Sequence, residues 1–330
     1  MGNRAEGFYN VAIHPRALKV SWEPLDRLRR YSKGYRSSDM PKNINTGGII
    51  SIKAQKRINN AIDWMLAQSK PKKYYSKKHK KHFHFRVNFL TLTLSAPQVH
   101  DDNVIKKKLL NNFLVQLRSK WNVKHYIWRA ESQSNGNIHF HICCDKYIPW
   151  WEMRATWNKI QNNLGYIDRF EEKFGHRDPN STDVHKVKKI RNLGGYLSKE
   201  IAKNSKGAMY TPLTFSRGKF KPCFNPSLVN QVLNENQKMY RVIQGNLWNL
   251  CEKLSQIKAS CMVVYGKARE ELEEIKKFFK SFVFSGDYYE VVNVPVNAWA
   301  NVIKGVLWDS YQNNLQMIRS GYVQNKISFI

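Results

Sequence analysis

Two histidines in one short apolar segment are the residues of this chain best suited to chemistry. The segment is Ile138-His139-Phe140-His141-Ile142, and its alternation of polar and apolar side chains predicts a β-strand. Successive side chains of a strand point to opposite faces, so both imidazoles lie on one face, about 7 Å apart. Such a pair can begin a divalent metal site, although in isolation it is more often an ordinary surface or core feature.

A third ligand comes from the preceding strand. Residues 124–131 (KHYIWRAE) alternate as a strand and end at Glu131, and Ser134-Asn135-Gly136-Asn137 follows. Asn-Gly is the strongest short-range signal for a β-hairpin, which folds Glu131 back beside the histidines. A carboxylate and two imidazoles fit Mg²⁺ or Mn²⁺, and the imidazoles favour manganese. Taken alone, Glu131 is equally typical of an exposed hairpin residue.

A tyrosine on a downstream helix could supply a nucleophile. After Gly194-Gly195, residues 193–204 predict a helix. Residues three, four and seven apart share one helix face, and here that face carries Tyr196, Lys199, Glu200 and Lys203. A phenol must lose its proton to attack phosphorus, and lysines one turn away favour that loss. The same pattern is also typical of an amphipathic surface helix in which the tyrosine only packs.

The elements that position these residues alternate between strands and helices. The patterns predict strands over 85–95, 124–131, 137–144 and 183–187, and helices over 104–120, 149–164 and 193–204. The order β-α-β-β-α-β-α predicts an α+β fold of ferredoxin-like type, in which helices cover one face of a central antiparallel sheet.

The three motifs together resemble a known family. The HFH strand, the glutamate upstream of it and the downstream YLSK segment are similar to the HUH endonucleases, specifically the rolling-circle replication initiators of phages and plasmids. The strand FLTLTLS (89–95) resembles the first motif of that family. The resemblance covers roughly residues 83–206. The tyrosine follows the histidines, as in the replication branch, whereas relaxases place it before them.

The resemblance implies a role for each motif residue. Glu131, His139 and His141 would hold the metal, which polarises the scissile phosphate. Tyr196 would attack, leaving a 5′-phosphotyrosine and a free 3′-OH that primes synthesis, and the reverse attack would rejoin the strand. Lys199 would stabilise the developing charge or favour loss of the tyrosine proton.

Glu200 marks a departure from part of the family. It stands where two-tyrosine initiators carry their second tyrosine, so a single-tyrosine mechanism follows. Glu200 would activate a water that ends the cycle, or would pair with Lys199 or Lys203.

The charge of the chain predicts a polyanionic partner. Lys and Arg total 55 against 25 acidic residues, giving a net charge of +30, and nucleic acid is the commonest partner of so basic a protein. The densest run, residues 70–81, is either a solvated turn or a strip for DNA phosphates with Tyr74 and Tyr75 available for stacking. The predicted DNA-binding residues are Lys72, Lys73, Lys77, Lys78, Lys80, Lys81, Lys186, Lys188, Lys189, Arg191 and Lys203. The predicted ligand is single-stranded or hairpin origin DNA.

The sequence predicts three zones along the whole chain. Residues 1–80 form a basic, partly flexible region with a helix near 49–68, and residues 81–215 form the HUH domain. Residues 216–330 form a mainly α-helical accessory region, with helices over 226–257, 269–282 and 296–317 and a strand over 261–265.

Several absences in the sequence narrow the function. No phosphate-binding Gly-x-x-x-x-Gly-Lys-[Ser/Thr] motif occurs, so we expect a host helicase to unwind the DNA and a host polymerase to extend the primer. Five cysteines without a Cys-x-x-Cys pair predict reduced thiols. No signal peptide or long apolar segment occurs, so we expect a cytoplasmic protein with no membrane partner.

Two other functions are compatible with these features. A single-tyrosine transposase would use the same catalytic residues, although such chains are usually shorter. A non-catalytic basic nucleic-acid-binding protein would carry the histidine pair incidentally.

Overall fold

The computed structural model describes residues 7–24, 50, 52–76, 80–133, 135–186, 214–216, 219–221, 243–280, 283–286, 289–294 and 305–320. These residues fall into two compact units. Unit 1 comprises Met1–Ile44, Asp63–Gln68 and Glu252–Ile330, and unit 2 comprises Asn45–Ile62 and Ser69–Cys251. The predicted division into three zones stays a prediction.

Unit 2 is built on a five-stranded antiparallel sheet, here called the central sheet. Its strands lie in the order β11-β6-β7-β5-β8 and span β5 (Asn88–Thr93), β6 (Tyr126–Ser132), β7 (Ile138–Cys144), β8 (Thr182–Lys186) and β11 (Trp248–Leu250). The order β6-β7-β5-β8 is that of the split βαβ arrangement predicted from the sequence. The predicted α+β class with antiparallel sheets is confirmed.

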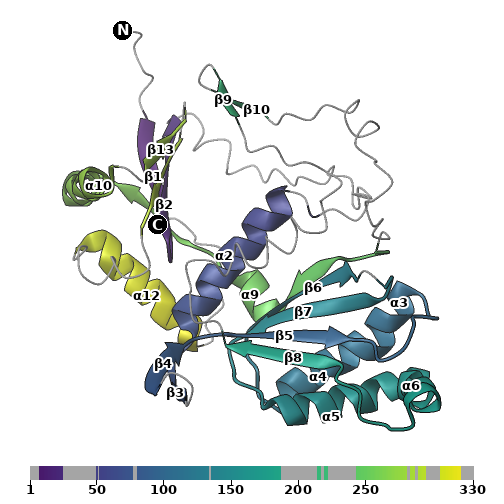
Figure 1. Ribbon diagram of the computed structural model, residues 1–330. Helices are drawn as coiled ribbons and strands as arrows, with labels where there is room; N and C mark the ends of the chain where they lie inside the picture. The colour runs from purple at the N-terminus through teal and green to yellow at the C-terminus, as the bar shows by residue number, and fades with distance from the viewer. Residues whose placement is uncertain are drawn as a thin grey trace. The chain divides into compact units, whose positions relative to one another are not determined.

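Helices cover one face of the central sheet, as Figure 1 shows for α4 and α5. The first helical stretch comprises α3 (Asp102–Ile105), a π-helical segment (Lys106–Leu110) and α4 (Asn111–Ser119), and the second comprises α5 (Trp150–Gln161), a 3₁₀ turn (Asn162–Leu164) and α6 (Tyr166–Phe174). The core between helices and sheet is apolar: Phe140 and Leu92 of the sheet are almost fully buried, as are Phe113 of α4 and Trp157 of α5. The Trp157 indole also donates a hydrogen bond to the carbonyl of Thr93, 2.8 Å away, which ties α5 to β5.

The hairpin between β6 and β7 follows the Asn-Gly prediction. Gly136 has φ of 84°, a left-handed conformation that glycine adopts without steric cost. The Asn135 side chain accepts a hydrogen bond from the Asn137 amide at 3.0 Å. Local turn chemistry therefore fixes the register of the two strands.

Unit 1 contains a second five-stranded antiparallel sheet, here called the terminal sheet. Its order is β12-β1-β2-β14-β13, and its strands are β1 (Gly7–His14), β2 (Ala17–Pro24), β12 (Ser260–Val264), β13 (Val283–Ser285) and β14 (Tyr289–Asn293). Its helices are α9 (Glu252–Gln256), α10 (Gly266–Phe278) and α12 (Val306–Ser320). Helix α12 packs against β1, β12 and α10.

The remaining described elements are one helix and two ribbons. Helix α2 (Ile52–Gln68) confirms the helix predicted near 49–68, and its last residues belong to unit 1. The ribbons are β3 (Lys72–Ser76) with β4 (Lys81–Phe85), and β9 (Thr214–Ser216) with β10 (Lys219–Lys221).

Three sequence predictions need correction or refinement. Strands β1 and β2 occupy residues 7–24, where the sequence predicted little regular structure. These strands form because β1 pairs with β12 and β2 pairs with β14, two strands from the far end of the chain. The helix predicted over 226–257 is wrong for residues 243–251, where β11 pairs with β6 instead. For the helix predicted over 296–317, α12 (Val306–Ser320) covers the part from residue 306 onward, and residues 296–304 lie outside the described residues.

Four of the five cysteines lie among the described residues. Cys143 and Cys144 are fully buried, Cys251 is buried and Cys261 is exposed. Burial raises the pKa of the Cys144 thiol to about 12, so it stays protonated at neutral pH. Cys223 lies outside the described residues.

Candidate metal centre

The candidate site lies on the face of the central sheet opposite α4 and α5. The pairing of β6 with β7 sets Glu131 directly opposite His139, and Arg129 opposite His141. Side chains alternate along each strand, so these four residues share one face while Ile138, Phe140 and Ile142 turn to the apolar core. The hairpin predicted from the sequence therefore brings the carboxylate to the histidines.

The three predicted ligands converge on one carboxylate oxygen. The Glu131 Oε1 atom lies 2.5 Å from His139 Nε2 and 2.6 Å from His141 Nε2. The side chains of Glu131 and His141 are 5% and 8% exposed, and that of His139 is 13% exposed. His139 is thus the ligand most open to an approaching substrate.

Glu131 is held in its charged form despite its burial. Burial by itself would raise the pKa of Glu131, but the hydrogen bonds and charges of His139 and His141 outweigh it and lower the pKa well below its ordinary value. The other oxygen, Oε2, lies 3.4 Å from the guanidinium of Arg129, which is itself buried. The carboxylate therefore offers a negative charge where a cation would bind.

Neighbouring strands orient His141. The Thr91 hydroxyl of β5 lies 3.1 Å from His141 Nδ1, and the Phe89 ring stacks on the imidazole at 5.0 Å. A proton on Nδ1, donated to Thr91, leaves the Nε2 lone pair directed at the site. The Thr91 hydroxyl can accept that proton, so Thr91 is placed to orient the ring for a metal bound at Nε2.

The donor set fits a divalent metal. The three side chains offer one ligand atom each, and these atoms all lie within 4.8 Å of one another. Two neutral imidazoles and one ionised carboxylate suit Mn²⁺, or Mg²⁺ with waters and phosphate oxygens completing its shell. The identity of the metal stays a prediction.

The sequence analysis did not name all the residues around the site. Arg129 precedes Glu131 by two residues, so strand alternation alone would have predicted that both lie on one face. Asp183 and His185 of β8 form an ion pair on the same face of the sheet, opposite Thr91 and Phe89 of β5. Thr91 and β8 become neighbours of the site only through long-range strand pairing.

The structure describes only some of the other predicted residues. Lys72, Lys73, Lys80 and Lys81 belong to the β3–β4 ribbon or border it, and Lys186 ends β8. The predicted tyrosine helix with its neighbours and the middle of the lysine run lie outside the described residues; these are Lys77, Lys78, Lys188, Lys189, Arg191, Tyr196, Lys199, Glu200 and Lys203.

Together, fold and site define an α+β domain with a candidate metal centre on one face of its sheet. Residues 87–205 of this chain match the model of the family described as replication-associated protein ORF2/G2P. The matched segment contains β5 to β8, hence all three candidate ligands, and also includes Tyr196. This match supports a replication initiator that interacts with DNA.

Other comparisons add nothing to this match. No curated protein and no solved structure matches the chain. Among the described residues, no helix is both long and apolar enough to cross a membrane.

Proposed function

We propose that this protein is a single-tyrosine, metal-dependent nickase that initiates rolling-circle replication. The observation that carries the proposal is the convergence of Glu131, His139 and His141 on one point, inside the segment that matches the replication-associated family. A buried carboxylate shared by two imidazoles is costly unless it is paired or binds a cation. A metal centre explains both the burial and the match.

The proposed reaction divides between the metal centre and the tyrosine helix. A metal held by the three ligands supplies Lewis-acid polarisation of the scissile phosphate. The deprotonated Tyr196 oxygen attacks phosphorus; the bond between phosphorus and the 3′ oxygen breaks, and that oxygen takes up a proton. The products are a 5′-phosphotyrosine and a free 3′-OH. The reverse attack by a 3′-OH rejoins the strand without ATP.

Three charged residues complete the proposed cycle. Arg129, beside Glu131, fixes the orientation of the carboxylate. Lys199, three residues after Tyr196 in the sequence, favours the ionised phenol and the charged transition state. Glu200 either activates a water for hydrolytic release or pairs with a neighbouring lysine.

The proposal predicts a covalent adduct of defined polarity. The full chain would be incubated with Mn²⁺ and single strands tiled across the replicon that carries its gene, each labelled at one end. A 5′-phosphotyrosine leaves the protein on the 3′-terminal fragment. A strand labelled at its 3′ end should therefore give a labelled protein band on a denaturing gel. The same strand labelled at its 5′ end should give a short product that a polymerase can extend.

Matched variants separate the tyrosine from other causes. Tyr196→Phe should abolish the adduct, because the phenylalanine ring has no oxygen to attack phosphorus. Tyr265→Phe is the control, since Tyr265 is 79% exposed and belongs to unit 1. An adduct that survives Tyr196→Phe, or that forms equally well in EDTA, contradicts the proposal. Cleavage confined to the ends of a mobile element would identify a transposase instead.

A further inference from the structure

The β3–β4 ribbon has two faces of different character. Strand pairing sets Tyr74 opposite Phe83 and Lys72 opposite Phe85, and these residues form what is here called the inner face. The alternate positions form the outer face, which consists of Lys73, Tyr75, His82 and His84. The two faces differ in what they contact.

The inner face packs against other residues of unit 2. Tyr74 stacks on Phe83 at 5.7 Å and meets the edge of Phe85 at 5.8 Å. Phe85 is 4% exposed and contacts the ring of Tyr147, which follows β7. The predicted base-stacking role of Tyr74 is therefore difficult to reconcile with its packing.

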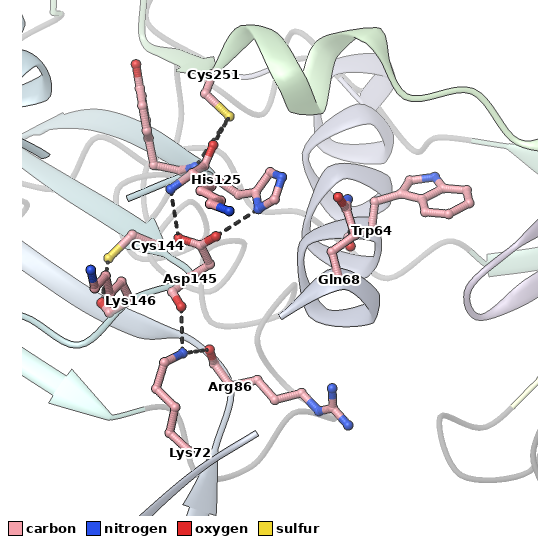
Figure 2. Close-up of polar contacts among 11 residues, drawn as sticks. Trp64, Gln68, Lys72, Arg86, His125, Cys144, Asp145, Lys146 and Cys251 are labelled. Atoms are coloured by element: carbon pink, nitrogen blue, oxygen red, sulfur yellow. Dashed lines mark hydrogen bonds and ion pairs between the residues drawn. The ribbon is translucent and has the colours of Figure 1, made fainter. Parts of the chain in front are cut away.

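Lys72 fastens the root of the ribbon. Its ammonium donates hydrogen bonds to the carbonyls of Arg86 and Asp145, at 3.0 Å and 2.6 Å (Figure 2). The Asp145 side chain is in turn held by His125 Nδ1 at 2.8 Å. Partial burial lowers the pKa of Lys72 in spite of the nearby Asp145 charge. This shift is expected for an ammonium that bonds to backbone carbonyls and is partly withdrawn from water. Lys72 therefore acts as an anchor of the ribbon.

The outer face is exposed and combines aromatic and basic side chains. Tyr75 is 53% exposed, and its ring meets His82 edge-to-face at 5.1 Å. Lys73, His82 and His84 are exposed, as are Lys80 and Lys81 at the described start of β4. The sequence contains no acidic residue between Asp63 and Asp101. The charge of this face therefore complements a polyanion.

We propose that the outer face of the ribbon binds single-stranded DNA, with a base stacked on the Tyr75 ring and phosphates held by the neighbouring lysines. An exposed ring among cations is the arrangement with which proteins hold unpaired strands. A two-stranded ribbon can also enter the major groove of a duplex, so the test below compares single-stranded with duplex DNA. This proposal rests on the proposed function in one respect only, namely that the bound nucleic acid is DNA.

The position of the ribbon relative to the metal centre supports this assignment. Strand β4 leads through Arg86 and Val87 directly into β5, whose Thr91 lies opposite His141. His82, which pairs with Tyr75, precedes Thr91 by nine residues, so the two lie at most about 30 Å apart. A DNA strand held on the outer face therefore needs only a short length of chain to reach the metal ligands.

Binding can be tested without cleavage. The full chain carrying Tyr196→Phe would be titrated, in EDTA, into a labelled mixed-sequence strand of about 20 nucleotides, longer than the usual site of such a platform. We expect Tyr75→Leu to weaken binding by about 5- to 100-fold, the effect of losing one stacked base. Tyr75→Phe should bind as the parent does, because the ring is retained. Tyr265→Leu is the matched exposed control.

A lysine variant tests the phosphate contacts independently. Lys73→Gln should reduce the slope of log affinity against log salt by about 0.7, the loss of one phosphate contact to a single strand. Lys159→Gln, an exposed lysine on α5, should leave the slope unchanged. If circular dichroism shows that Tyr75→Leu does not fold, the salt dependence of Lys73→Gln tests the proposal in its place.

Several results would overturn the proposal. Tyr75→Leu binding like the parent excludes stacking, and equal weakening by Phe and Leu assigns the effect to the hydroxyl. A duplex of the same sequence that binds as tightly, with the same loss, shows that the ribbon docks duplex DNA. A Tyr75 effect without any covalent adduct from the wild-type chain would leave the platform standing and refute the nickase.

Discussion

The two five-stranded antiparallel sheets of this protein bury different kinds of residue. The terminal sheet buries aliphatic side chains such as Val11, Leu18 and Val292. The central sheet buries such residues too, but the face opposite its helices also buries Arg129, Glu131 and His141. Within the described part of unit 1, Asn314 alone is a buried polar residue. Similar sheets can thus serve as a structural core or as the support of a reactive site.

The largest expected effect distinguishes a glutamate in each sheet. Glu131→Gln keeps the shape of the side chain but removes the charge that two imidazoles share, so Mn²⁺-dependent adduct formation should fall by at least about 100-fold. Glu290 of β14 pairs with Lys276 at 2.5 Å, and Glu290→Gln should leave the rate unchanged. The measurement is the initial rate of adduct formation at saturating DNA. Equal rates for Glu131→Gln and the wild type would remove the metal centre from the reaction.

A smaller effect is expected from the residue that orients His141. Thr91→Val removes the hydroxyl beside His141 Nδ1 while keeping the volume, so the affinity for Mn²⁺ should fall by about 10- to 100-fold. Thr93→Val is the matched control one pleat along the same face, since Thr93 bonds through its backbone: its amide donates to the Ser181 carbonyl and its carbonyl accepts from Trp157. Affinity would be taken from the Mn²⁺ dependence of the adduct rate. Equal losses in both variants would indicate a general effect on the sheet rather than the orientation of His141 by Thr91.

The two sheets also differ in how much of them the sequence predicts. Strands β5 to β8 of the central sheet follow one another along the chain, and the Asn-Gly turn fixes the register of β6 and β7 through local backbone geometry. The terminal sheet pairs Tyr9 with Val264, and no local pattern predicts a partner at that separation. Strands β1 and β2 were missed for this reason, although each alternates.

The same distinction applies within the candidate site. Glu131, His139 and His141 follow from alternation and one hairpin, so the sequence sufficed to bring them together. The contact between Thr91 and His141 depends on the pairing of β5 with β7, which only the complete sheet defines. The anchoring of Lys72 depends on Asp145, 73 residues away. Composition identified a basic strip but could not divide it into two faces.

Two carboxylates extend the comparison to pH, because their pKa values shift in opposite directions. The pKa of Glu131 is lowered from an ordinary value of 4.5 because its histidine partners outweigh its burial. The pKa of Asp63, on the part of α2 in unit 1, is raised from 3.8 because burial outweighs its ion pair with Arg16. A lowered pKa means that the charged form stabilises the fold, and a raised pKa means that the charged form weakens it.

The smallest expected effect is therefore on stability: the unfolding free energies of the two wild-type and variant pairs should differ with pH in opposite directions. In metal-free protein, the advantage in unfolding free energy of the wild type over Glu131→Gln should be fully present near pH 7, and should shrink as the pH falls below 4.5 and the unfolded chain takes up the proton. The wild type compared with Asp63→Asn should behave oppositely. Its relative stability should rise as the pH falls through the raised pKa of Asp63, because the buried charge is neutralised. Urea denaturation in EDTA at a series of pH values measures both differences. Parallel slopes for the two pairs would mean that Glu131, like Asp63, is governed by its burial, and would remove the charged carboxylate on which the proposed metal centre depends.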